Sequence, residues 1–149
     1  MTHLGEATYV LGIEIIRNRE RGLLGLSQRG YIEKVLKRFN MSDCAGGSVP
    51  MTKGDKMSQS QAPQNDIERR DMQDKPYASL VGSVMYAQVY TRTDIAFPIS
   101  VLGRFQSNPG QAHWIAGNKV LKYLQRTKDY KLGYRRSQNL ELIGYADAD

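Results

Sequence analysis

The stretch YVLGIEIIRNRERGLLGLS, residues 9–27, decides the fold at the N-terminal end of the chain. Residues 9–16 are rich in β-branched side chains, turn-forming and charged residues follow over 18–22, and a second apolar run covers 23–27. Two apolar runs separated by a short polar turn are typical of an antiparallel hairpin. The sequence therefore predicts a β-hairpin.

Downstream of this hairpin, apolar residues recur at steps of three and four, which predicts four helices. The first covers residues 27–39 and begins at Ser27, a common helix-capping residue. The second, 76–89, is apolar on nearly all sides and should be buried. We expect the other two at 94–105 and 111–125.

The segments between and after these helices complete the predicted fold. Residues 40–75 are polar and rich in Gly, Pro, Gln and Ser, which predicts a long loop with little regular structure. Residues 131–136 and 140–146 favour two more strands, joined by the polar residues 137–139. The predicted fold class is α+β, with hairpins at both ends and helices between them.

Composition limits what the chain can bind. Lys and Arg together number 21 and Asp and Glu 15, a formal net charge of +6. This surplus favours nucleic acid or acidic partners, although a solvated basic surface has the same composition. Cys44, His3 and His113 stand apart from one another, so we expect no disulfide, metal or cofactor. The longest uncharged run, 76–91, is shorter than the roughly 20 residues that span a bilayer.

Two groups of basic residues are candidates for phosphate contacts. The first lies on the predicted hairpin and the second along one side of the last predicted helix. Their members are Arg17, Arg19 and Arg21 in the first group, and Lys119, Lys122 and Arg126 in the second. A solvated basic face is the alternative, because no row of aromatic residues alternates with these charges as a nucleic-acid stacking platform requires.

Several strings in the sequence resemble the reverse transcriptase of Ty1/copia-type retrotransposons. Residues 4–15, LGEATYVLGIEI, are similar to the segment that follows the polymerase Asp-Asp motif in that family. Further similar blocks are LSQRGYI at 26–32, the residues around VGSVMY at 81–86, NPG at 108–110, HW at 113–114 and GYADAD at 144–149. They follow the family's order along essentially the whole chain.

This resemblance implies a division of the chain and an absence of catalysis. Residues 1–40 would hold the palm-end hairpin and thumb-side helix, 41–75 the polar loop, 76–132 the helical connection and 133–149 the truncated start of ribonuclease H. The polymerase aspartates would lie upstream of this chain. Asp147 resembles the first metal ligand of ribonuclease H, but without its partner carboxylates it cannot form a two-metal site. We therefore expect no catalytic residue and no enzymatic activity.

As a stand-alone chain, the sequence also resembles the secreted RxLR effectors of plant-infecting downy mildews, which are oomycetes. That resemblance implies secretion, entry into the nucleus or cytoplasm of a host plant cell, binding to a host protein of unknown identity and suppression of host defence or cell death. No classical signal peptide is visible in the sequence. The residues of a degenerate RxLR motif are Arg21, Gly22, Leu23 and Leu24.

Three functional hypotheses follow from these observations. The main hypothesis is a secreted, non-enzymatic effector derived from a retrotransposon. The second is a nucleic-acid-binding, catalytically incomplete fragment of a copia-type reverse transcriptase, and the third is a relic without a selected function. The RxLR-like residues do not decide among them, because they coincide with the turn of the predicted hairpin.

Overall fold

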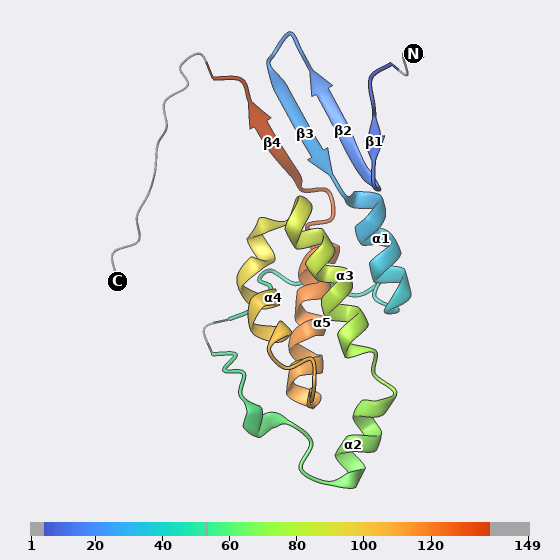
Figure 1. Ribbon diagram of the computed structural model, residues 1–149, viewed down its shortest axis with the longest axis vertical. Coiled ribbons are helices and arrows are strands. Elements are labelled where there is room, and N and C mark those ends of the chain that lie inside the picture. The colour runs from blue at the N-terminus through green and yellow to red at the C-terminus, as the bar shows by residue number, and fades with distance from the viewer. Residues whose placement is uncertain (1–4, 53, 138–149) are drawn as a thin grey trace, which may run out of the picture.

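Helices form the body of the molecule, and a four-stranded sheet projects from one end of that body (Figure 1). The computed structural model describes residues 5–52 and 54–137. The elements are β1 Tyr9–Val10, β2 Ile13–Asn18, β3 Leu23–Ser27, α1 Arg29–Arg38, η1 Gln59–Gln61, α2 Asp66–Gln73, α3 Tyr77–Tyr90, η2 Thr93–Ile95, α4 Ala96–Gly103, α5 Gln111–Arg126 and β4 Lys131–Arg135. The predicted α+β class is confirmed.

The sheet is antiparallel, with the strand order β1-β2-β3-β4. The predicted hairpin is confirmed in β2 and β3, but its first strand is not continuous over residues 9–16. Leu11 and Gly12 have positive φ angles of 50° and 78°, and they turn the chain so that Val10 pairs with Ile13. The expected single strand is therefore two strands, because Leu11 and Gly12 both have left-handed backbone conformations and close a tight turn between them.

Strand β4 confirms the strand predicted at 131–136, and its partner is β3. Leu132 pairs with Leu26, and Tyr134 pairs with Leu24. The chain after α5 thus returns to the N-terminal hairpin, so the sheet is built from both ends of the described chain (Figure 1). The other predicted strand, 140–146, lies outside the described residues, and the predicted domain boundaries stay a prediction.

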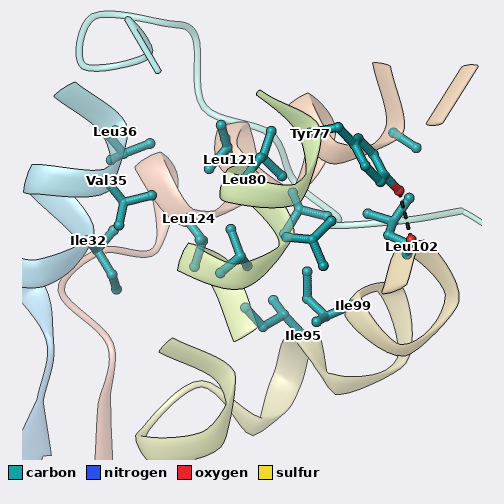
Figure 2. Close-up of a cluster of buried hydrophobic side chains, with 14 residues drawn as sticks. Ile32, Val35, Leu36, Tyr77, Leu80, Ile95, Ile99, Leu102, Leu121 and Leu124 are labelled. Atoms are coloured by element: carbon teal, nitrogen blue, oxygen red, sulfur yellow. Dashed lines mark hydrogen bonds between the residues drawn. The ribbon is translucent and has the colours of Figure 1, made fainter. Parts of the chain in front are cut away.

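The core lies among the helices and is centred on α3 (Figure 2). Leu80, Val81 and Val84 of α3 are fully buried. Burial of α3 follows from the apolar character predicted for residues 76–89. Gly117 of α5 lets the two helices approach closely, because a Cβ atom there would lie 3.0 Å from Leu80 Cδ2. The remaining members of the buried cluster are Ile32, Val35, Leu36, Tyr77, Ile95, Ile99, Leu102, Ala116, Val120, Leu121 and Leu124.

Tyr77 anchors the start of α3 inside this core. Its hydroxyl donates a hydrogen bond of 2.8 Å to the carbonyl oxygen of Leu102 in α4 (Figure 2). Burial raises the pKa of Tyr77 to about 12, so the hydroxyl keeps its proton. The hydrogen bond therefore joins α3 to α4 over the whole ordinary pH range.

The segment 40–75 contains more regular structure than its composition predicts. Helix α2 occupies residues 66–73 and begins with Asn65, whose side chain accepts a 2.9 Å hydrogen bond from the Glu68 amide. The predicted loop is wrong here, because the only apolar residues of α2 are the buried Met72 and the exposed Ile67, which give almost no apolar spacing. Met51 and Met57 also pack against the core, so this segment wraps the helical body.

The helix predicted at 94–105 is divided into η2 and α4. Pro98 is the third residue of α4, within the first turn, where a missing amide hydrogen costs no helical hydrogen bond. Among residues 5–52 and 54–137, no helix combines the length and the apolar character that crossing a bilayer requires.

Candidate nucleic-acid interface

Arginine side chains gather at the end of the sheet that points away from the helices. The β2–β3 turn is closed by Gly22, with φ of 60°, and by the Asn18 side chain, which accepts a 2.9 Å hydrogen bond from the Arg21 amide. Strand β4 ends beside this turn, because Arg135 pairs with Leu23. We call the resulting group the arginine end, and its members are Arg17, Arg19, Arg21, Arg135 and Arg136.

Backbone contacts hold together the two segments that carry these arginines. The amide of Arg136 donates a 2.7 Å hydrogen bond to the carbonyl oxygen of Gly22. A Cβ atom on Gly22 would lie only 2.7 Å from the Arg136 Cβ, so glycine allows the two segments to meet. A shallow hollow of about 510 Å³ results, and its lining includes Arg19, Arg21 and Arg135.

One carboxylate partly neutralises the arginine end. Glu6 accepts hydrogen bonds of 3.0 Å from Nη1 of Arg17 and from Nε of Arg19. These contacts, led by the one from Arg19, hold the pKa of Glu6 below its usual value. Glu20 also lines the 510 Å³ hollow. Positive charge is still in excess here, because five guanidinium groups lie with these two carboxylates.

The second predicted basic group is placed on α5, in the helical body, and is partly covered. Lys119 forms an ion pair of 2.6 Å with Asp55. Hydrogen bonds from Lys119 and Thr52 lower the pKa of Asp55 to about 2. A Cβ atom on Gly46 would lie 2.7 Å from the Arg126 Cβ, so the chain before Asp55 crosses this side of α5.

The chain also follows α5 beside Lys122. The amide of Gly47 donates a 2.9 Å hydrogen bond to the Lys122 carbonyl oxygen, and the Gln125 side chain donates one of 2.5 Å to the Ser42 carbonyl oxygen. The structure therefore does not bring Arg17 and Arg19 together with Lys119, Lys122 and Arg126 on one surface. The arginine end is the more open of the two groups.

Sequence reasoning missed three residues of this surface: Tyr134, Arg135 and Arg136. They form the second half of the predicted strand 131–136, and the Arg-Arg pair is visible in the sequence. Their place became clear only from the pairing of β4 with β3, which puts Tyr134 opposite Leu24. An aromatic ring therefore lies among the arginines although the sequence shows no alternating aromatic row.

The RxLR-like residues lie within the same structure. Arg21 and Gly22 belong to the β2–β3 turn, and Leu23 and Leu24 begin β3. Leu23 and Leu24 pair with Arg135 and Tyr134 of β4. These four residues thus have a structural role as a turn and the start of a strand.

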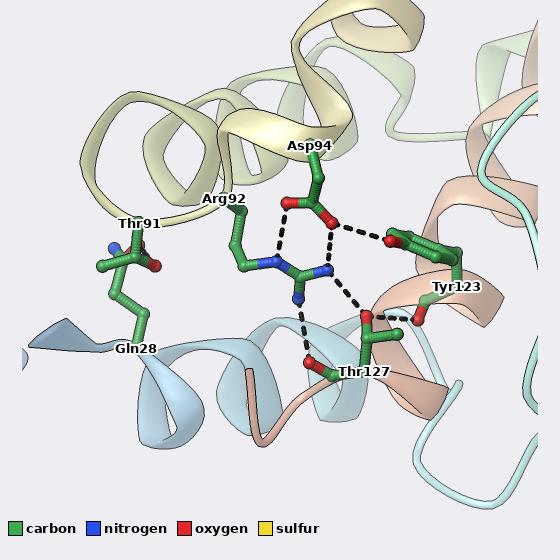
Figure 3. A network of polar contacts seen from close by, with 6 residues as sticks. All are labelled: Gln28, Thr91, Arg92, Asp94, Tyr123 and Thr127. Carbon is green, nitrogen blue, oxygen red and sulfur yellow. Dashed lines mark hydrogen bonds and ion pairs between the residues drawn. The ribbon is translucent and has the colours of Figure 1, made fainter. Parts of the chain in front are cut away.

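A buried polar network joins the helical body to the sheet (Figure 3). The guanidinium of Arg92, 1% exposed, donates to both carboxylate oxygens of Asp94, at 3.0 and 2.8 Å. It also donates to the carbonyl and hydroxyl oxygens of Thr127, at 3.1 and 2.6 Å. Burial acts to raise the pKa of Asp94, but hydrogen bonds from Arg92 and Tyr123 outweigh it and the pKa is lowered. Thr127 lies between α5 and β4, so the network fixes the direction in which β4 leaves the helices.

Histidine and acidic residues form no metal centre in the part of the chain that the structure describes, where no three of the usual ligand side chains converge. His113 is fully buried, stacks on Phe105 with ring centroids 4.2 Å apart, and accepts a 2.9 Å hydrogen bond from the Gly110 amide. Burial lowers its pKa and favours the neutral ring. His3 and Asp147 lie outside the described residues.

Comparisons with known proteins show which proteins this chain resembles. The retrovirus-related Pol polyprotein from transposon TNT 1-94 of Nicotiana tabacum is 44% identical over 149 residues, which is all of this chain and 11% of that protein. The retrovirus-related Pol polyprotein from transposon RE2 of Arabidopsis thaliana is 32% identical over 141 residues, 95% of this chain and 9% of that protein. The chain thus spans about a tenth of the length of these polyproteins.

One further relative has a different description. Secreted RxLR effector protein 161 of Plasmopara viticola is 46% identical over 78 residues, which is 52% of this chain and 55% of that protein. No protein-family model matches the sequence. No solved structure matches it either.

Proposed function

Because the chain is related along its whole length to a segment of the copia-type retrotransposon Pol polyproteins, we propose that it contacts nucleic acid and supplies no catalytic group of its own. The proposal places the nucleic acid at the arginine end. It follows the second hypothesis drawn from the sequence, keeps the contact predicted for the hairpin arginines and leaves out the one predicted for α5.

The observation that carries this proposal is the convergence of five arginines from two distant parts of the chain. Residues 17–21 supply three of them and residues 135–136 the other two. Guanidinium groups bind phosphate through paired N–H donors and remain charged at all ordinary pH values. An open surface with several such groups is suited to the phosphate backbone of a nucleic acid.

The effector hypothesis remains as a second candidate, supported by the match to the Plasmopara viticola protein. That match covers about half of this chain, whereas the polyprotein matches cover 95% to 100% of it. Secretion, a host-cell location and a host protein partner belong to this second candidate alone. Suppression of elicited cell death by the chain expressed in leaves would favour it over the first.

Charge reversal at the arginine end tests the first proposal. We would measure binding of the full chain to labelled DNA and RNA oligonucleotides by fluorescence anisotropy at several salt concentrations. The double substitution Arg21→Glu with Arg135→Glu should weaken binding and reduce the slope of log affinity against log salt by about 0.7 to 0.9 for each lost phosphate contact. Both side chains are exposed, so the fold should be retained.

A matched control is the double substitution Lys122→Glu with Arg126→Glu, which changes the net charge equally on the exposed part of α5. This control should change binding much less. An equal loss of affinity in both variants would mean that only the net charge of the chain matters for binding. A larger loss of affinity in the control would place the phosphates along α5. The same purified chain, given Mg²⁺, should show neither primer extension nor RNA cleavage.

A further inference from the structure

We propose that Tyr134 stacks on an unpaired nucleobase, so that the arginine end takes single-stranded nucleic acid in preference to duplex. This inference rests on the proposed nucleic-acid function and names its substrate class. It depends on four features: the register of β2, β3 and β4, the exposure of Tyr134, the hollow beside it, and the surrounding charge.

The strand register puts Tyr134 on the same side of the sheet as Arg17. Arg17 pairs with Leu24, and Leu24 pairs with Tyr134, so the three residues form one row across the strands. Residues directly opposite in antiparallel strands point to the same face, and neighbouring strands lie about 4.8 Å apart. Arg17 and Tyr134 are therefore separated by a single leucine.

Tyr134 is exposed and differs in this respect from Tyr31, Tyr77, Tyr86 and Tyr123 of the helical body. Its relative exposure is 52%. The hydroxyl groups of Tyr31, Tyr77 and Tyr86 each donate to a backbone carbonyl oxygen, and Tyr123 donates to Asp94. These four rings join elements of the fold, whereas the ring of Tyr134 stands on β4, the outermost strand on that side of the sheet among the described residues.

The surface beside Tyr134 has the size and chemistry of a nucleotide site. A hollow of about 450 Å³ is lined by Arg17, Arg19, Leu24, Tyr134 and Arg136, among others. The apolar side chain of Leu24 and the tyrosine ring offer a surface to a base. Arg136 offers donors to the flanking phosphates, together with Arg17 and Arg19, which also bind Glu6. Aromatic rings combined with a basic surface are the usual means by which proteins hold unpaired nucleotides.

This arrangement favours a single strand for a geometric reason. In a duplex, each base is stacked between its neighbours and paired at its edge, so an exposed ring on the surface of a sheet does not reach its face. An unpaired base can turn onto the ring at no cost in base pairing. The phosphate contacts of the arginines are open to both kinds of nucleic acid, so Tyr134 is the residue that distinguishes them.

The test compares Tyr134→Ala with Tyr134→Phe in the full chain. The probes are a labelled single-stranded oligonucleotide, a duplex of the same sequence and a single strand of equal length with abasic sites. Tyr134→Ala should weaken binding to the intact single strand about fivefold or more, the loss of one stacked base, and leave duplex and abasic binding nearly unchanged. Tyr134→Phe keeps the ring and should retain wild-type binding.

Tyr9→Ala is the matched control, because Tyr9 is an exposed tyrosine of the same sheet that pairs with Glu14, away from the arginines. It should leave single-strand binding unchanged. Two results would overturn this inference and leave the proposed function intact. One is that Tyr134→Ala lowers the affinity for all three probes equally. The other is that Tyr134→Ala lowers no affinity while the arginine variants still weaken binding. A wild-type chain that binds none of the probes would overturn both.

Discussion

Lys119 shows how a single residue can match a sequence prediction in position and differ from it in environment. The prediction placed Lys119 on a basic side of a helix, free to contact phosphate. Its ammonium group instead lies 2.6 Å from a carboxylate oxygen of Asp55, whose side chain is only 15% exposed. The charge of Lys119 is thus already partnered within the chain, by a residue of the segment predicted as a loop.

The low pKa of Asp55 gives this ion pair a definite pH dependence. Asp55 titrates at about 2 in the folded chain against 3.8 for an ordinary aspartate. Its contribution to stability is therefore complete above about pH 4 and is lost as the pH falls toward 2. Lys119 is 44% exposed, so we expect the contribution to be about 1 kcal/mol or less.

Asp55→Asn should therefore lower the unfolding temperature at pH 7 and have little effect near pH 2. Asparagine can still accept the 2.9 Å hydrogen bond from the Thr52 amide, so the substitution isolates the charge. Thermal unfolding followed by circular dichroism at several pH values measures the difference. Asp43→Asn, at an exposed position, is the control. A difference that stays constant from pH 7 to pH 2 would contradict the assignment of the ion pair.

At the scale of secondary-structure elements, glycines decide where segments can meet. Gly110 precedes α5, and a Cβ atom built on it would lie 1.8 Å from the carbonyl oxygen of Gln61 in η1. Gly30 lies inside α1, and a Cβ atom there would meet nothing within 4 Å. Substitution of glycine by alanine should therefore have opposite effects on the stability of the chain at the two positions.

Gly110→Ala should destabilise the chain by about 3 kcal/mol, because backbone atoms must move to relieve the overlap. Gly30→Ala should stabilise it by about 0.5 to 1 kcal/mol, since alanine is the better helix former. Urea unfolding of both variants gives the two free energies. A mild effect of Gly110→Ala would mean that η1 is not packed against the start of α5.

The elements also show what the sequence could predict. Apolar spacing located α1, α3 and α5, because their buried faces follow the helical period. It failed for α2, which buries one methionine and is held by its cap and its packing. The turn at Leu11 and Gly12 was missed because β-branched residues on both sides suggest one continuous strand.

The candidate site could be predicted only in part from the sequence, because some of its residues come from one local segment and others from a distant strand. The hairpin carries its arginines locally, so Arg17, Arg19 and Arg21 could be found from the sequence. Arg135 and Tyr134 join them through pairing between strands that lie more than a hundred residues apart in the chain. Such a pairing depends on how the helices between the strands pack, and no local pattern encodes it.

At the scale of the whole molecule, the sheet depends on the helical body for its position. The sheet projects from one end of the helices (Figure 1). Near their junction, Gln28 accepts a 2.7 Å hydrogen bond from the Thr91 hydroxyl, and Arg92 holds Thr127 shortly before β4 (Figure 3). The arginine end needs β4 beside β3, so these polar contacts support the proposed site from a distance.

Arg92→Met should therefore affect both stability and the sheet. Removing the guanidinium leaves Asp94 without its ion pair and Thr127 without its donors, which we expect to cost about 3 kcal/mol. Adding Asp94→Asn should recover part of this loss, because the unpaired charge is then absent, while the hydroxyl of Tyr123 can still donate to the new side chain. Urea unfolding measures both variants.

Hydrogen exchange should show faster exchange of the β4 amides in Arg92→Met than in the native chain, with the amides in the middle of α3 changed less. Equal acceleration in β4 and α3 would mean that Arg92 stabilises the body as a whole and does not specifically hold the sheet to it.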